Sequence, residues 1–471
     1  MKIWLLIRHQ YKEWHLNKLL YVFIGSIACL WIFCLFTGLN EYKAVAKTRQ
    51  IAQHNDREQW LNQGDKHPHI AAHFGNFAFK PINVLSIFDK GIDAYSGTYI
   101  YLEAHRQNDF LLSPAQSSSS LIRFGELNVA LLLQLLVPLL LIILSFNSII
   151  SERLSGTLTL IKVTGISGHQ MVVAKILSPL MLALSTIVVL YAISFVLFYF
   201  SDIRFTSEDL VKTSLILIAY GCYYFIFLTV TISIATFSKT LKQSLIISLS
   251  VWIFACVVSP KLLANFSSAI YTLPSNTAFK EAVRNDIING MDGHNTSDIR
   301  AKKFTADLLK KHKVDSTSQL PVNIEGLVMM EGEKYSSKVY NNHFDSLSNA
   351  LQKQQNIFTY ASFLNPLLSI KNLSIGLSNT DLSNEIAFRK DAEIYRMQFV
   401  QAMNEDMAKN SKEGDFNTYK TGKKLFSHIP DFAYKNADTL KVFKNHLLDF
   451  IALIFLMLVS VILIKITAQK I

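Results

Sequence analysis

The chain has 471 residues, of which half are hydrophobic and only 17% charged, and its formal net charge is +11. So high an apolar content excludes an ordinary soluble protein with one or two cores and indicates a membrane protein. The basic residues do not gather on a soluble module, so the positive charge does not indicate a nucleic-acid partner.

Six apolar runs are long enough to cross a bilayer, which takes about 20 residues for roughly 30 Å of hydrocarbon. These runs cover residues 19–39, 129–150, 171–200, 211–237, 243–263 and 447–464. We therefore predict an all-α polytopic membrane protein with six transmembrane helices and two extracytoplasmic insertions, at 40–128 and 264–446. The first run is long and aromatic, and no small-residue cleavage site follows it, so we expect a span rather than a signal peptide.

The distribution of Lys and Arg orients these six runs. The stretches before the first run, after the second, between the fourth and fifth, and after the last are basic, whereas the link 201–212 is acidic. If the runs alternate across the bilayer, all four basic stretches fall on one side. Because an excess of Lys and Arg marks the cytoplasmic side, both termini are predicted to be cytoplasmic.

Residues 1–18 are expected to form a helix that lies at the membrane surface. Tyr11, Trp14 and Lys18 recur at helical spacing, and Lys and Trp suit the headgroup layer. A frayed cytoplasmic tail is the alternative.

The first insertion should begin with a polar helix that continues from the membrane. Glycines and prolines then break the pattern, and a run of four serines follows at 117–120. We expect loops there, with short strands as an addition.

Four histidines stand out in this insertion: His67, His69, His73 and His105. On a helix His69 and His73 would share one face, and imidazoles at that spacing can hold zinc or copper. However, no His-Glu-x-x-His motif occurs, and Pro68 is expected to interrupt a helix. The prediction is therefore no metal, with histidines that hold the loop-rich segment together by hydrogen bonds; a metal site is the alternative.

The second run and the stretch behind it carry the most specific pattern. Pro138 predicts a kink whose freed backbone groups must be satisfied by neighbouring helices or water. After this run, residues 151–164 read SERLSGTLTLIKVT, with a charged pair followed by Gly-Thr and an apolar-rich run. We expect a helix at 152–164 that lies at the membrane face and is pushed by another protein.

The second insertion is long enough for a domain of its own. Residues 298–313 and 381–407 have helical periodicity with many charges. Between them, residues 363–377 are apolar but too few to span, and this length predicts an interfacial helix at the outer leaflet.

Several kinds of chemistry are not indicated. No Gly-x-x-x-x-Gly-Lys-Ser/Thr motif occurs, so the chain has no nucleotide site of its own, and we do not expect an enzyme. The span interiors hold almost no ionisable residues, which argues against a proton- or sodium-driven carrier. A disulfide framework and a thiolate metal site are also not expected, because all four cysteines lie in the apolar runs: Cys29, Cys34, Cys222 and Cys256.

Residues 123–167 resemble the second span and following loop of ABC-2 type permeases, with Glu152-Arg153 and then Gly156-Thr157-Leu158 as the specific part. The insertions are similar to those of a bacterial subfamily with an extracytoplasmic domain of uncharacterised function. That likeness rests on PHIAAHFGNFAFKP, YIYLEAHRQND, FLNPLLSIKNLSIGLSNTDL and AFRKDAEIYRMQFVQAMNEDM. The family loop often reads Glu-Arg-Glu, whereas Leu154 follows Arg153 here.

The resemblance implies a coupling helix in the region 151–170 that contacts a cytoplasmic ABC ATPase dimer through Glu152, Arg153, Gly156, Thr157 and Leu158. It implies a connecting helix near the ATPase, around Trp4, Arg8, Tyr11 and Trp14. It further implies a second permease subunit, identical or a relative, and location in the bacterial inner membrane. ATP and Mg would be bound by the ATPase, with no cofactor in this chain.

Two functions remain open on this basis. The first is a permease that moves or extracts an unidentified substrate. The alternative is an ATPase-driven mechanotransmitter that acts on a periplasmic or lipoprotein partner without transport through the spans. A membrane enzyme that uses the histidines is the least favoured.

Overall fold

The computed structural model describes residues 2–111 and 127–471, and it is largely helical. Within these two ranges, six helices are long and apolar enough to cross a membrane, as the sequence predicts. They are α2 (Leu19–Leu61), the broken helix α5–η4–α6–α7 (Val129–Leu154), α9 (Gly168–Phe200), α10 (Ser207–Phe237), the broken helix α11–η5–α12 (Leu241–Ile270) and α20 (Leu447–Lys470). The chain is therefore a multi-pass membrane protein by length and composition of its helices.

Helix α10 forms the centre of the bundle, where it packs against α6 (Val137–Ser145), α9 and α20. The π-helical turn η4 (Leu132–Leu136) directly precedes α6 and Pro138, where the sequence predicts a kink. Since proline has no N–H, the carbonyl of Gln134 loses its partner four residues on. The buried hydroxyl of Tyr223 donates to that carbonyl at 2.7 Å, so a neighbouring helix satisfies the freed group as expected.

Helix α2 continues well past the apolar run, as expected for a polar helix that leaves the membrane. Its 43 residues make it about 65 Å long, roughly twice the hydrocarbon thickness. At its far end Trp60 is fully buried and donates to the carbonyl of Phe426 at 2.9 Å. One rigid element therefore connects the bundle to the rest of the chain.

A short helix and a small sheet follow α2: α3 (Pro68–Phe74), β1 (Asn76–Phe79), β2 (Tyr99–Leu102) and β3 (Gln107–Leu111). The antiparallel order is β1-β2-β3, with an irregular register between β2 and β3. These strands confirm the short strands allowed for by the sequence. The serines at 117–120 lie outside the described residues.

The second insertion is helical, and the two periodic stretches predicted in it are α14 and α17. Its helices are α13 (Asn276–Asn289), α14 (Ser297–His312), α15 (Ile324–Ala361), α16 (Pro366–Leu377), α17 (Leu382–Asn410), α18 (Lys423–Ser427) and α19 (Thr439–Asn445). Three-residue 3-10 turns occur at Thr317–Gln319 and Asp415–Asn417.

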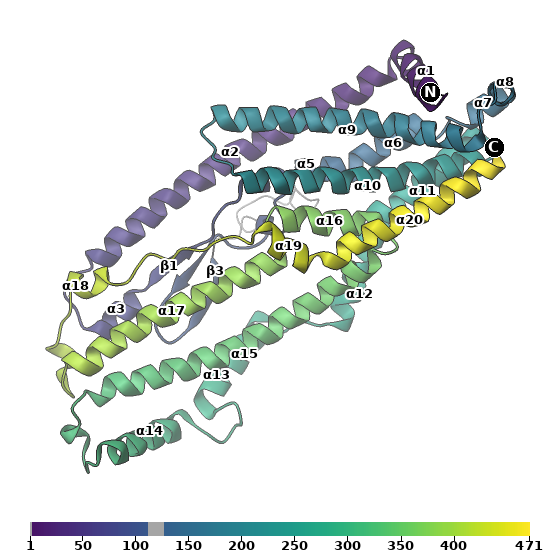
Figure 1. The fold of residues 1–471 in the computed structure, drawn as a ribbon. Coiled ribbons are helices and arrows are strands. Elements are labelled where there is room, and N and C mark those ends of the chain that lie inside the picture. The colour runs from purple at the N-terminus through teal and green to yellow at the C-terminus, as the bar shows by residue number, and fades with distance from the viewer. Residues whose placement is uncertain (1, 112–126) are drawn as a thin grey trace.

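The two insertions share one hydrophobic core. Side chains from α3 and the sheet, such as Ala72 and Ile100, pack in the same cluster as Phe388, Phe399 and Met403 of α17. We call this unit, built from the end of α2, α3, β1–β3, α13–α15, α17 and α18, the distal domain. It lies at one end of an elongated molecule, whereas α1 (Lys2–Leu16), α7 (Ile150–Leu154), α8 (Thr157–Val163) and both termini lie at the other (Figure 1).

The prediction of an interfacial helix at 363–377 is wrong. Helix α16 is buried over nearly its whole length between α10 and α20. A helix without a wide polar face is better buried inside a protein than laid on a surface. Asn365 caps this helix through the amide N–H of Leu367, and its side-chain amide also donates to the carbonyl of Ala255 at 2.8 Å, which fixes α16 to the bundle.

Candidate functional site

The stretch expected to form one helix at 152–164 consists of two short helices, so that prediction is wrong in its detail. Helix α7 (Ile150–Leu154) ends before Gly156, and α8 (Thr157–Val163) begins after it. Gly156 has a φ of 77°, a left-handed conformation that glycine adopts without steric cost. The hydroxyl of Thr157 donates to the carbonyl of Glu152 at 3.2 Å and closes the turn.

Glu152 connects α7 to two other helices. Its carboxylate forms an ion pair with the ammonium group of Lys175 on α9, and the side chains are 19% and 8% exposed. The same ammonium donates to the side-chain oxygen of Gln10 on α1 at 2.8 Å. A buried lysine is stable only with such partners, so this contact holds α1, α7 and α9 together.

Arg153 connects α7 to α10. Its guanidinium donates to the carbonyls of Thr236 at 2.7 Å and Ser238 at 3.2 Å. These carbonyls belong to the last turn of α10, which has no helical partners for them and carries the negative end of the helix dipole. The two charges of the Glu-Arg pair therefore attach α7 to different helices of the bundle.

The helix predicted within residues 1–18 is present as α1, and it packs against α9. Trp14 is buried and Tyr11 donates to the carbonyl of Ser178 at 3.1 Å, whereas Trp4 and Arg8 are exposed. The four residues named for this helix therefore lie on two faces. Lys2 also reaches the turn that follows α8, where its ammonium donates to the carbonyl of Gly165 at 2.7 Å.

The outer side of α7 and α8 is apolar and exposed. Leu158 points inward and is 9% exposed, while Leu154, Leu160 and Val163 are 66%, 67% and 81% exposed. We call these last three residues the apolar tip. Exposed apolar side chains that gather in this way are typical of a surface that contacts another protein or the membrane.

The structure adds Gln10, Lys175 and Lys2 to the site residues indicated by the sequence. The sequence alone could have indicated Lys175, because a lysine within an apolar helix is typical of a functional site and needs a partner. Gln10 and Lys2 had no such signal, since their contacts with α9 and with the turn that follows α8 join residues more than 160 positions apart.

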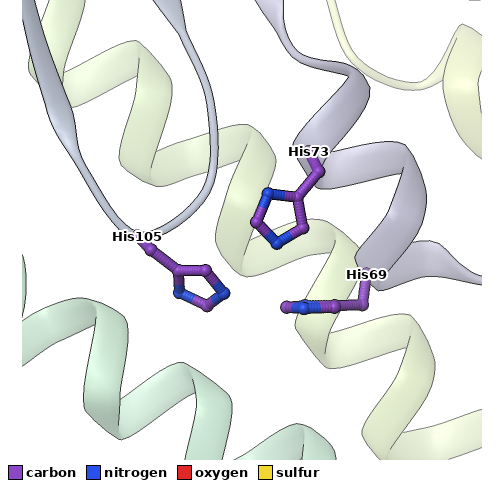
Figure 2. Close-up of side chains that lie close together, drawn as sticks. All are labelled: His69, His73 and His105. Carbon is purple, nitrogen blue, oxygen red and sulfur yellow. The ribbon is translucent and has the colours of Figure 1, made fainter.

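The histidines of the first insertion lie in the distal domain. Pro68 does not interrupt a helix there, which corrects the sequence prediction: it is the first residue of α3, where the missing N–H costs nothing. The ring of His67 caps this helix by accepting from the backbone N–H of His69. His69 and His73 then face His105, which lies in the turn between β2 and β3 (Figure 2).

Burial is the main cause of the altered protonation of these rings. Burial first, and then the neighbouring rings of His105 and His73, lower the pKa of His69 to about 4. The pKa of His73 is lowered for the same two reasons. Both imidazoles are therefore neutral at pH 7.

A cleft of about 770 Å³ lies on another side of the distal domain. Helix α2 forms one wall with Tyr42 and Arg49, and β1 and the turns behind it form the other with Phe77 and Lys80. This mixture of aromatic and charged side chains suits a peptide or small-molecule ligand.

A buried polar cluster around His446 joins the distal domain to the bundle. The ring of His446, at the start of α20, contacts Asp381 at 3.1 Å and Asp449 at 3.3 Å. Burial disfavours the charged ring, but hydrogen bonds to the two carboxylates outweigh it and raise the pKa of His446 to about 9. Gly376 makes room for the ring, since a Cβ there would lie 2.3 Å from it.

This cluster predicts a pH dependence of stability. The folded pKa of His446 is raised above its usual value of 6.5, so the stabilisation is complete below about pH 6.5 and is lost as the pH rises through about 9. The full effect is on the order of 3 kcal/mol. Thermal unfolding in detergent at pH 6.5 and pH 10 should show a larger loss for the wild type than for His446→Gln. Equal losses in both proteins would contradict the prediction.

These helices define a multi-pass membrane protein, and one part of it matches a described family. Residues 276–435 match the family "Domain of unknown function (DUF3526)". No curated protein and no solved structure matches the chain. The matched residues run from α13 past α18 and include α15 and α17, but neither the Glu152-Arg153 pair nor the four histidines of the first insertion.

Proposed function

We propose that this chain is the membrane subunit of an ABC-2 type transporter, driven by a separate cytoplasmic ATPase that docks on the apolar tip. The observation that carries the proposal is the attachment of α7 to the bundle. Glu152 binds Lys175 of α9, and Arg153 binds the end of α10, so a force on α8 reaches two spans through charged contacts. A surface loop without a mechanical role needs no such anchors.

In this proposal the end of the molecule that carries both termini is cytoplasmic, in a bacterial inner membrane. The basic stretches found by sequence lie at this end. The ATPase dimer binds ATP and Mg, and its closure moves α7 and α8 relative to the bundle. Coupling requires that the ATPase contacts differ between its two states. The distal domain is then extracytoplasmic, and a second permease subunit completes the complex.

The docking surface can be tested with the full chain purified from native membranes in mild detergent. Wild-type protein should bring an ATPase with it, measured by ATP hydrolysis and mass spectrometry. Leu160→Asp with Val163→Asp should reduce the co-purified hydrolysis at least tenfold, because charges replace the exposed apolar contact.

Leu440→Asp is the matched control, since Leu440 is 63% exposed but lies on α19, away from the termini. It should leave the co-purified hydrolysis unchanged. The proposal fails if no ATPase accompanies the wild type, or if the double variant retains it.

A mechanotransmitter is the second candidate, and α2 favours it. This single helix passes from the end that carries the termini into the distal domain, where Trp60 anchors it. A displacement of the bundle would therefore move the distal domain and its cleft. A substrate path through the spans is not required for this function, and transport assays in vesicles distinguish the two candidates.

A further inference from the structure

Three imidazole rings converge on one point of the distal domain. One ligand nitrogen each from His69, His73 and His105 lies within 4.8 Å of the others. The ring centroids are 4.7 Å apart for His69 and His73, 5.1 Å for His69 and His105, and 4.9 Å for His73 and His105. Figure 2 shows the rings directed toward a common space between α3 and the β2–β3 turn.

Local structure explains why these side chains meet. His69 and His73 are four residues apart on α3, so they share one face of the helix. His105 has a φ of 69°, which is uncommon for a residue other than glycine and costs about 1 kcal/mol or more. Such a conformation persists only where the surroundings hold it, and it places the His105 ring beside the helix.

Glu333 of α15 holds His105 in this position. Its carboxylate oxygen accepts from the backbone N–H of His105 at 2.6 Å and contacts Nδ1 of the ring at 2.6 Å. The Glu333 side chain is fully buried and is held in turn by the guanidinium of Arg396 at 3.2 Å. A buried carboxylate on one ring nitrogen fixes the tautomer and turns the other nitrogen toward the cluster, as at metal-ligating histidines.

We propose that His69, His73 and His105 form a solvent-accessible site for one divalent transition-metal ion of the Zn²⁺ and Cu²⁺ class. Three imidazole ligands favour these ions over Mg²⁺ and Ca²⁺, which prefer oxygen ligands. At a metal–nitrogen distance of about 2.0–2.1 Å, tetrahedral ligands lie about 3.3 Å apart, so small side-chain rotations close the observed spacing. Glu333 is a positioning residue, because it acts through His105.

The site has room for a further ligand. His73 and His105 are exposed and His69 is partly exposed, so three protein ligands leave a position open to solvent. Structural zinc sites are normally closed by four protein ligands. The open position therefore indicates an ion that exchanges with solvent or with a bound partner. This inference does not depend on the proposed ATPase coupling.

The test uses the full chain in detergent, purified without a polyhistidine tag and stripped with a chelator. Equilibrium dialysis against Zn²⁺ or Cu²⁺, followed by elemental analysis, should find one ion per chain. His69→Ala and His73→Ala should each weaken binding at least tenfold, while Mg²⁺ and Ca²⁺ should not bind. The electron paramagnetic resonance spectrum of the Cu²⁺ form should show nitrogen coupling that these variants lose.

His54→Ala is the control for histidines elsewhere, because His54 is exposed on α2 and pairs only with a carboxylate one turn away among the contacts described. It should bind one ion as the wild type does. Glu333→Gln should keep the stoichiometry and weaken binding, since the ring of His105 loses its fixed orientation. The proposal is overturned if less than one ion binds per chain, or if His69→Ala and His73→Ala bind as tightly as wild type.

Discussion

Replacement of Arg396 by methionine should lower the free energy of unfolding of the distal domain by about 3 to 5 kcal/mol. Arg396 is fully buried and lies between two buried carboxylates. It contacts Glu393 at 2.7 Å and Glu333 at 3.2 Å, and it also donates to the carbonyl of Glu103 at 3.0 Å. Without the guanidinium, two negative charges stay in the core uncompensated.

The reason for so large an effect is the cost of an unpaired buried charge. Burial by itself would raise the pKa of Glu333, but the hydrogen bond from His105 and the charge of Arg396 outweigh it and lower that pKa. Glu333 is therefore ionised in the folded protein at pH 7. A methionine of similar length fills the space of Arg396 but leaves that charge in place.

Thermal unfolding followed by tryptophan fluorescence is suited to this measurement, because Trp60 lies fully buried in the distal core. Lys390→Met is the matched control: it also removes one cation of an α15–α17 pair, but Lys390 and Asp345 are 59% and 51% exposed. The control should change stability by less than about 1 kcal/mol. Equal shifts for Arg396→Met and Lys390→Met would show that the buried network contributes no more than a surface pair.

A compensated variant separates charge from packing. Arg396→Met combined with Glu333→Gln and Glu393→Gln removes the cation and both anions together. It should recover most of the lost stability, because the remaining groups are neutral. If it is less stable than Arg396→Met alone, the carboxylates serve the fold by their shape and hydrogen bonds rather than through the ion pairs.

The sequence predicts the spans well and the contacts between distant segments poorly, for a physical reason. Spans follow from length and apolarity, which are local properties, and the helices α14 and α17 follow from an equally local periodicity. The formation of helix α16 also follows from the local sequence, but its burial does not. Its short apolar stretch fits both an interfacial and an enclosed helix, and only its packing against α10 and α20 decides between them.

The candidate sites show the same division. Glu152, Arg153 and Gly156 are visible in the sequence as a pattern, but their partners Lys175 and the end of α10 come from other helices. For the histidines, helical spacing predicts that His69 and His73 lie together. The position of His105 beside them depends on the sheet and on Glu333, which the sequence pattern does not show. The prediction that Pro68 interrupts a helix is wrong because a proline can begin a helix as well as break one.

Charge reversal at Glu152 should reduce ATP hydrolysis stimulated through this chain at least tenfold, if α7 transmits force as proposed. Glu152→Lys brings two ammonium groups together at a buried position. Lys175 cannot move away from the new lysine because its backbone is part of α9. The attachment of α7 to α9 and α1 is then lost, while Arg153 still holds α10. A tenfold loss corresponds to about 1.4 kcal/mol, which is below the usual effect of a broken buried pair.

The swapped pair, Glu152→Lys with Lys175→Glu, should restore most of the stimulated hydrolysis. It rebuilds the ion pair in the opposite sense, and the amide of Gln10 can turn to donate its N–H₂ to the new carboxylate in place of Glu13. The measurement is ATP hydrolysis by the reconstituted complex in proteoliposomes, with insertion checked by extraction. Lys242→Glu is the control, because Lys242 is exposed at the start of α11, near the same end of the molecule.

The swap distinguishes coupling from docking, because the two roles place Glu152 in contact with different proteins. If Glu152 acts mainly by touching the ATPase, the swapped protein stays as inactive as the single variant, since the docking charge is still reversed. If it acts by holding α7 to α9, the swap recovers activity and the ATPase remains bound throughout. The position of the carboxylate favours the second outcome, because it is turned inward to Lys175, whereas the side chains of the apolar tip face outward.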